Sequence, residues 1–273
     1  MSIFRARTQK GYDIKVLSEL LKENIKTACF EIDKDSISLR MMDNPKTVLI
    51  DMVLDASNFT LYKYRYPDPK MYIGVTLIHL YKMLKSIKKK DIVELFITSD
   101  HPTDLGIKVF PEGNTQITTS YIKIQTIQNI DIDIPTGYNN YPVIVPCSDF
   151  QKMCKGLGHV SQTTHIFSKR FLIKFTTDAG GVMKRSTEFG EFDDDEDDDE
   201  DEIIYSEDFD TEQLIRISKL ASFSTSMQIY TKKNLPMLLR TTISNMGKIS
   251  IYVKSKDMQK NEQYSNNEEE EDE

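Results

Sequence analysis

Eight basic side chains recur at helical spacing in four short amphipathic segments of the chain. Spacings of three and seven residues place the members of each pair on one face of a helix. Because lysine supplies a mobile positive charge without base preference, the natural target of such a face is phosphate. Lysines three apart also occur on ordinary solvated helices, so the recurrence in all four segments is what favours a binding function. The eight residues are Lys15, Lys22, Lys82, Lys85, Lys152, Lys155, Arg216 and Lys219.

These residues would be positioned by four helices in a chain that otherwise has the pattern of short strands. Apolar residues recur at helical spacing in 12–24, 76–87, 148–156 and 211–222. Alternating segments separated by turn residues lie at 26–32, 47–55, 59–64, 91–99, 105–110, 227–230 and 248–254. Two helices fall in the first part of the chain and two in the second. We therefore expect an α+β chain of two similar halves, joined by an extended connector.

The strongest charge feature of the chain is acidic. Every residue of Asp193–Glu202 is Asp or Glu, and a further acidic run occupies residues 268–273. The net charge is -8, yet without these sixteen residues 27 acidic residues face 35 basic ones, so the remainder carries +8. A basic body favours a polyanionic partner, whereas acidic runs are typical of solvated segments or of segments that bind basic proteins.

No pattern of an enzyme or of a metal site accompanies these charges. The chain has no G-x-G-x-x-G, P-loop or H-E-x-x-H motif. The four histidines have no ligand-like spacing to cysteine, and the acidic run lacks the glycine and spacing of a calcium loop. Three cysteines without a C-x-x-C pair favour reduced core thiols, and no signal peptide or membrane-spanning segment is visible. We expect no catalysis, no metal and no cofactor.

Short motifs distributed over almost the whole chain resemble the proliferating cell nuclear antigen family, the DNA sliding clamps of eukaryotes, archaea and some large DNA viruses. No single motif is unique to the family, and their joint order and spacing carry the resemblance. They are FRARTQKGYDIKVLSELLKENIKTACFEI from residue 4, L-x-x-M-D at Leu39–Asp43, Gly74-Val75, K-x-L-K at Lys82–Lys85, Ile134-Pro135, Asp149-Phe150 and Asn245-Met246-Gly247.

The resemblance implies a DNA-clamp fold of two similar domains, each with antiparallel sheets and two helices. It places the domains at 1–122 and 141–256, the connector at 123–140, an acidic loop at 188–202 and a disordered acidic tail at 257–273. Three chains would close head to tail into a ring whose helices line the central hole. The eight basic residues would then face duplex DNA, although Arg216 lies outside the matched pattern.

The resemblance also implies two protein-binding surfaces. A partner-peptide pocket beside the connector would comprise Met42, Val48, Ile132, Ile134, Pro135, Pro236, Tyr252 and Val253, for which an ordinary core role is the alternative. Subunit contacts would pair edge strands near 115–121 and 181–187 through Ile117, Thr119, Tyr121, Val182 and Lys184. The chain departs from the family at Lys254-Ser255, where relatives have Ala-Pro, so partner contacts with that tail are not carried over.

The resemblance identifies a processivity factor that encircles duplex DNA without sequence preference. The implied partners are further copies of the chain, a DNA polymerase, a clamp loader and other replication or repair proteins with clamp-binding peptides. The implied location is the nucleus, or the replication compartment of a large DNA virus. Two alternatives stay open: a specialised subunit of a heterotrimeric clamp, and a histone-chaperone-like protein that binds basic partners through its acidic loop and tail.

Overall fold

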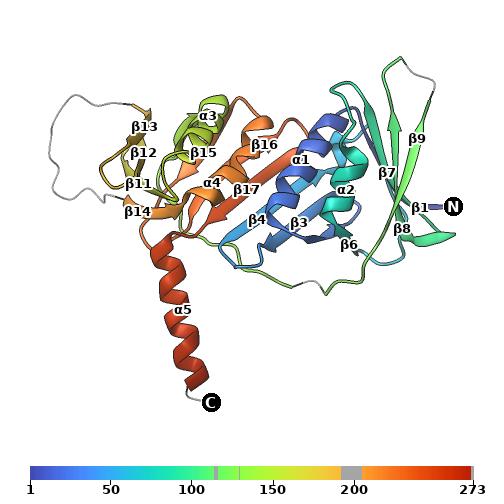
Figure 1. Cartoon of the computed structure of the whole chain (residues 1–273). Coiled ribbons are helices and arrows are strands. Elements are labelled where there is room, and N and C mark those ends of the chain that lie inside the picture. Colours follow the sequence, from blue (N-terminus) through green and yellow to red (C-terminus); the bar gives the residue numbers. More distant parts are fainter. Residues whose placement is uncertain (114–115, 129, 192–204, 272–273) are drawn as a thin grey trace. The chain divides into compact units, whose positions relative to one another are not determined.

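The chain forms two compact units in a computed structural model that describes residues 1–113, 116–128, 130–191 and 205–271 (Figure 1). The first unit comprises Met1–Asn44, Leu49–Ile132 and Thr242–Ile249, and the second comprises the rest of the chain. None of the helices within the described ranges is both long enough and apolar enough to cross a membrane.

The first unit follows the order strand, helix, five strands, helix, three strands. Its helices are α1 (Gly11–Asn24) and α2 (Leu77–Leu84), with a short 3₁₀ turn at Ala56–Asn58. Its strands are β1 (Ser2–Thr8), β2 (Thr27–Ile32), β3 (Ser36–Met42), β4 (Val48–Asp55), β5 (Leu61–Tyr64), β6 (Met71–Thr76), β7 (Ile92–Thr98), β8 (His101–Phe110) and β9 (Thr118–Lys123).

The second unit nearly repeats that order. Its helices are α3 (Cys147–Leu157), α4 (Thr211–Ile217), which continues into a 3₁₀ segment at Ser218–Ser222, and α5 (Lys256–Glu271). Its strands are β10 (Val143–Pro146), β11 (Thr163–Lys169), β12 (Leu172–Asp178), β13 (Lys184–Gly190), β14 (Tyr205–Asp210), β15 (Ser226–Tyr230), β16 (Met237–Ile243) and β17 (Gly247–Val253). The end of β16 and the start of β17 fall within Thr242–Ile249 and so count with the first unit. The repeated order confirms the expected pair of similar halves, each with antiparallel sheets and two helices before the added α5.

Within the first unit, one sheet has the strand order β5-β1-β7-β8-β9, and a second group runs β4-β3-β2-β6. Residues of β1 alternate in burial: Phe4 and Ala6 lie in the core, while Arg5 and Arg7 lie on the opposite face. Helices α1 and α2 pack against each other, and Leu20 and Leu84 are fully buried there. The apolar stripe predicted for each helix is therefore the side that builds the core.

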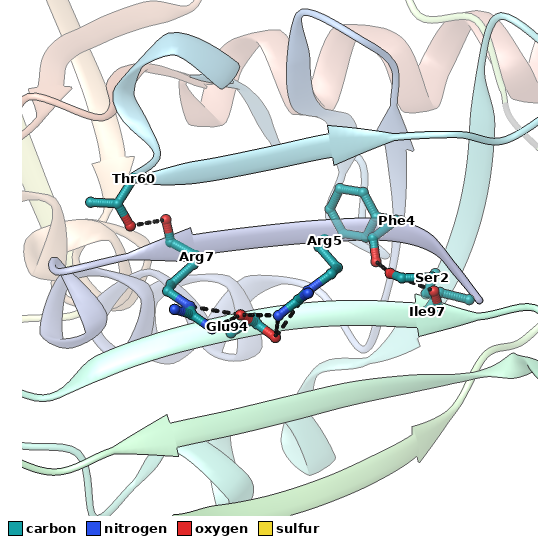
Figure 2. Close-up of polar contacts among 7 residues, drawn as sticks. All are labelled: Ser2, Phe4, Arg5, Arg7, Thr60, Glu94 and Ile97. Atoms are coloured by element: carbon teal, nitrogen blue, oxygen red, sulfur yellow. Dashed lines mark hydrogen bonds and ion pairs between the residues drawn. The ribbon is translucent and has the colours of Figure 1, made fainter.

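The face of β1 that carries the arginines is closed by a buried carboxylate on the neighbouring strand (Figure 2). The Glu94 side chain is only 1% exposed, and its oxygens lie 2.8 Å from Arg5 Nη2 and 2.6 Å from Arg7 Nη2. The Arg7 guanidinium also lies 4.9 Å from the centre of the Phe110 ring. Two partly exposed cations thus neutralise one buried anion. Removing Glu94 would leave the positive charges of Arg5 and Arg7 without their partner.

The connector is attached to the first unit through main-chain hydrogen bonds. Gly74 and Gln125 exchange both bonds, with N···O distances of 3.0 and 2.9 Å. A Cβ atom on residue 74 would lie 2.5 Å from the Gln125 carbonyl oxygen, so glycine is required for this close approach.

In the second unit, the strand orders are β13-β12-β11-β14 and β10-β15-β16-β17. Phe150 of α3 packs edge-on against Phe175 of β12, with ring centres 6.1 Å apart. Helix α4 begins at an Asp210 cap, whose carboxylate accepts a hydrogen bond from the Glu212 N–H at 2.9 Å.

The acidic tail differs from the expected disorder, because Lys256–Glu271 form helix α5. The Ser255 hydroxyl accepts a hydrogen bond from the Met258 N–H at 3.3 Å, and Lys254 pairs with Glu262 at 2.6 Å. Lys256 also donates to the Thr163 hydroxyl in β11. The acidic composition alone favoured disorder, whereas the cap and these contacts support the beginning of a helix.

Candidate nucleic-acid interface and partner surfaces

The basic residues of the first unit converge on one helix pair. Lys22 Nζ of α1 lies 4.6 Å from the centre of the Tyr81 ring of α2. Lys15 Nζ donates a hydrogen bond of 3.3 Å to the carbonyl of Ile87, just beyond the end of α2. Both lysines of α1 therefore lie against the helix that carries the other pair.

Lys82 of α2 and Lys85, the C-cap residue of that helix, are the more accessible members of this set. Lys82 and Lys85 are exposed, whereas Leu80 and Leu84 of the same helix are buried. Lys15 and Lys22 are half-buried, and Lys22 also pairs with Glu23. Lys82 and Lys85 are thus less restrained by packing than Lys15 and Lys22.

In the second unit, α3 repeats this arrangement. Lys152 and Lys155 are exposed, and Lys152 is paired with Asp149 at 3.1 Å. On the packed neighbouring segment, Arg216 and Lys219 are half-buried. Arg216 Nε is buried and has no hydrogen-bond partner among the described residues. Arg216 and Lys219 are therefore less accessible than Lys152 and Lys155.

The pocket residues predicted from the family differ widely in burial. Val48, Pro236, Tyr252 and Val253 are buried in the second unit. The remaining four are half-buried: Ile134 and Pro135 belong to the second unit, Met42 and Ile132 to the first. The half-buried residues keep part of their apolar surface exposed, whereas the other four are core residues of the second unit.

Tyr138 is a functional candidate that the sequence did not single out. Its hydroxyl donates a hydrogen bond of 2.6 Å to the Pro236 carbonyl, and its ring centre lies 6.1 Å from that of Tyr252 and 6.2 Å from that of Tyr230. Burial raises the pKa of Tyr138, so the donor stays protonated. Tyr138 therefore anchors the second part of the connector to two predicted pocket residues. The sequence signal that could have identified Tyr138 was an aromatic residue within a mostly polar connector.

Two sheet edges carry the residues predicted for subunit contact. Strand β9 is an edge of the first unit's five-stranded sheet, where Tyr121 is 60% exposed. Strand β13 is an edge of the second unit's sheet, and Val182, just before it, is 84% exposed. Ile117, Thr119 and Lys184 are also exposed. Each edge could extend its sheet by pairing with another strand.

Two further features of the sequence, the cysteines and the acidic run, provide no site among the described residues. Cys29, Cys147 and Cys154 are buried and free, and burial raises the pKa of the Cys147 thiol to about 11. Within the ranges that the structure describes, no cluster of three or more His, Cys, Asp or Glu side chains is placed to hold a metal ion. The acidic run Asp193–Glu202 lies outside those ranges.

Comparison with known proteins covers nearly the whole chain. The N-terminal domain of proliferating cell nuclear antigen matches residues 3–134, and the C-terminal domain of the same family matches residues 134–256. The probable DNA polymerase sliding clamp 1 of Paramecium bursaria Chlorella virus 1 is 23% identical, over 92% of this chain and 96% of the viral protein. The proliferating cell nuclear antigen of Chaetomium thermophilum is 24% identical, over 93% of this chain and 98% of the fungal protein.

Proposed function

Because the chain belongs to the proliferating cell nuclear antigen family, we propose that it is a sliding clamp that encircles duplex DNA and keeps a DNA polymerase on its template. The observation that carries the proposal is the gathering of Lys15, Lys22, Lys82 and Lys85 on the α1–α2 pair, with the α3 lysines as its counterpart. The expectation of no catalysis agrees with a family of non-enzymatic scaffold proteins.

Loose phosphate contacts suit this function. Lysine charges attract the DNA backbone without reading sequence, and salt weakens the attraction. If retention on DNA comes from a closed ring, each contact can stay weak enough for the ring to slide. The half-buried members, Lys15, Lys22, Arg216 and Lys219, then contribute a positive field, while the exposed lysines of α2 and α3 contact phosphates directly.

A ring requires a head-to-tail contact between copies, and the two exposed sheet edges support one. Strand β9 of one copy would pair with β13 of the next, which would remove an exposed edge from each. Exposed apolar side chains at Tyr121 and Val182 would be covered by the same contact. Light scattering tests this step: three chains of 31.6 kDa give about 95 kDa, whereas a hetero-subunit stays monomeric when purified alone.

Partner proteins would bind at the connector. The half-buried Ile132, Ile134 and Pro135 offer apolar surface, and Tyr138 holds the connector onto Pro236 and Tyr252 beneath it. The expected partners are a polymerase, a clamp loader and other replication or repair proteins. The chain itself would be located in the nucleus or in a viral replication compartment, in keeping with the sources of the two relatives.

The functional test is primer extension by the cognate polymerase on circular primed DNA with a clamp loader and ATP. The chain should lengthen the products made in a single binding event. A histone-chaperone-like protein would instead bind histones through its acidic segments and leave product length unchanged, so that result would reject the clamp function.

A further inference from the structure

Three side chains on one face of the second unit's four-stranded sheet form a hydrogen-bonded chain that the clamp function does not use. Strands β11 and β14 pair antiparallel there, with His165 opposite Asp208 and Phe167 opposite Ser206. Because side chains alternate between the two faces of a strand, Ser206 and Asp208 lie on the same face of β14, beside His165. The sheet register therefore brings His165 together with residues 41 and 43 positions later.

The imidazole of His165 bridges the other two side chains. Its Nδ1 lies 2.8 Å from Asp208 Oδ1, and its Nε2 lies 3.2 Å from Ser206 Oγ. An ionised carboxylate only accepts hydrogen bonds, so Nδ1 of the neutral ring carries the hydrogen and Nε2 keeps a lone pair. Nε2 then accepts the hydrogen of the Ser206 hydroxyl. Serine, imidazole and carboxylate thus follow the order in which a base activates a nucleophile and a carboxylate orients the base.

All three side chains are open to solvent. Those of His165 and Asp208 are 46% and 51% exposed, and Ser206 is exposed as well. Exposed polar groups bond equally well to water, so their alignment contributes little to the stability of the fold. The same exposure lets a small electrophile reach the Ser206 hydroxyl. The alignment therefore points to reactivity at Ser206.

We propose that Ser206 is an activated nucleophile and a site of covalent modification by acyl donors with a good leaving group, the chemical class of thioesters and acyl phosphates. Ser206 Oγ attacks the carbonyl carbon while its proton moves to His165 Nε2, and Asp208 stabilises the imidazolium that forms. The bond from the carbonyl carbon to the leaving group breaks, the proton passes from His165 to that group, and an ester remains on Ser206. The reaction modifies the chain without turnover of a substrate, so it agrees with a non-enzymatic scaffold and does not depend on ring formation.

The test uses the full chain with p-nitrophenyl acetate as the acyl donor. Acid-quenched samples are mapped by mass spectrometry, and the initial rate of acetylation is measured at each serine. Ser148 is the internal control, because it is exposed and its hydroxyl donates directly to Asp149 at 3.3 Å, with no imidazole between them. Ser206 should be acetylated about tenfold faster than Ser148, which is less than the usual effect of a general base because this site is open to water.

Variants of the two supporting side chains test the role of each. His165→Ala removes the base and should lower the initial rate at Ser206 about tenfold. Asp208→Ala should lower it about fivefold, because the imidazole loses the group that orients it. The matched control His159→Ala replaces an exposed histidine outside this group and should leave the rate at Ser206 unchanged.

Three outcomes would overturn the proposal. The first is equal acetylation rates at Ser206 and Ser148, and the second is an unchanged rate at Ser206 in His165→Ala. The third is acetylation of His165 while Ser206 stays unmodified, which would make the imidazole the nucleophile. Circular dichroism of each variant separates loss of reactivity from loss of fold.

Discussion

Reversing the charge of Lys82 and Lys85 is the sharpest perturbation of the DNA-facing surface. Lys82 is exposed on α2 and Lys85 is exposed at its C-cap, whereas Leu80 and Leu84 are buried, so glutamate at both lysine positions leaves the core contacts unchanged. Exposed substitutions of this kind alter the free energy of unfolding by about 0.5 kcal/mol or less. A change in DNA binding would therefore report on charge.

The size of the effect follows from counterion release. Each phosphate contact contributes about 0.9 to the magnitude of the slope of log K against log salt concentration. Relative to 1 M salt, one such contact therefore raises the affinity at 0.1 M salt about eightfold. If both lysines contact phosphates, the Lys82→Glu/Lys85→Glu variant should lose about 60-fold in affinity for a linear duplex. The salt slope should fall by about 2.

The assay is fluorescence anisotropy of a labelled duplex titrated with clamp at several salt concentrations. A matched control is Lys34→Glu/Lys63→Glu, which makes the same charge change at exposed lysines of the same unit outside its helices. The control should lose far less affinity, because only the overall charge of the clamp changes. Equal losses in the two variants, or an unchanged salt slope in the α2 variant, would refute the placement of α2 toward DNA.

Four further outcomes test other parts of the structure. Glu94→Ala should lower the free energy of unfolding in urea by about 3 kcal/mol, because two arginines lose their buried partner; a loss below about 1 kcal/mol would contradict this. Val182→Asp should turn trimers into monomers in light scattering, and persistent trimers would place the subunit contact elsewhere. Replacing Ile132 and Ile134 by Ser should abolish binding of partner peptides while trimers persist, and normal binding would move the pocket away from the connector. The raised pKa of Cys147, about 11 against 9.0 for the free thiol, predicts slow alkylation of the folded protein at pH 8. It also predicts a contribution to stability that is present below pH 9 and lost as pH rises from 9 to about 11, because the unfolded thiol ionises first; fast alkylation at pH 8 would contradict this burial.

The helices were predictable because their apolar spacing directly marks the buried face. The predicted segment 12–24 differs from α1 by one residue, and 148–156 lies within α3. The predicted segment 76–87 is longer than α2, which ends at Leu84 before the lysine-rich turn. The predicted segment 211–222 changes from α-helix to 3₁₀ at Ser218, a distinction that periodicity does not resolve.

Contacts between distant residues could not be predicted from local pattern. Glu94 meets two arginines that lie almost 90 positions earlier, and Tyr138 meets the Pro236 carbonyl 98 positions later. The sequence shows each of these residues, but only the fold brings them together.

Topological retention on DNA tests the central claim most directly. The clamp is loaded onto nicked circular DNA with a clamp loader and ATP, and bound protein is then separated from free protein by gel filtration in about 1 M salt, where surface charge is screened within about 3 Å. The clamp should remain with the circles and should leave when a restriction enzyme linearises them, because a ring slides off free ends. Loss from intact circles in high salt, or equal retention on circular and linear DNA, would contradict encirclement.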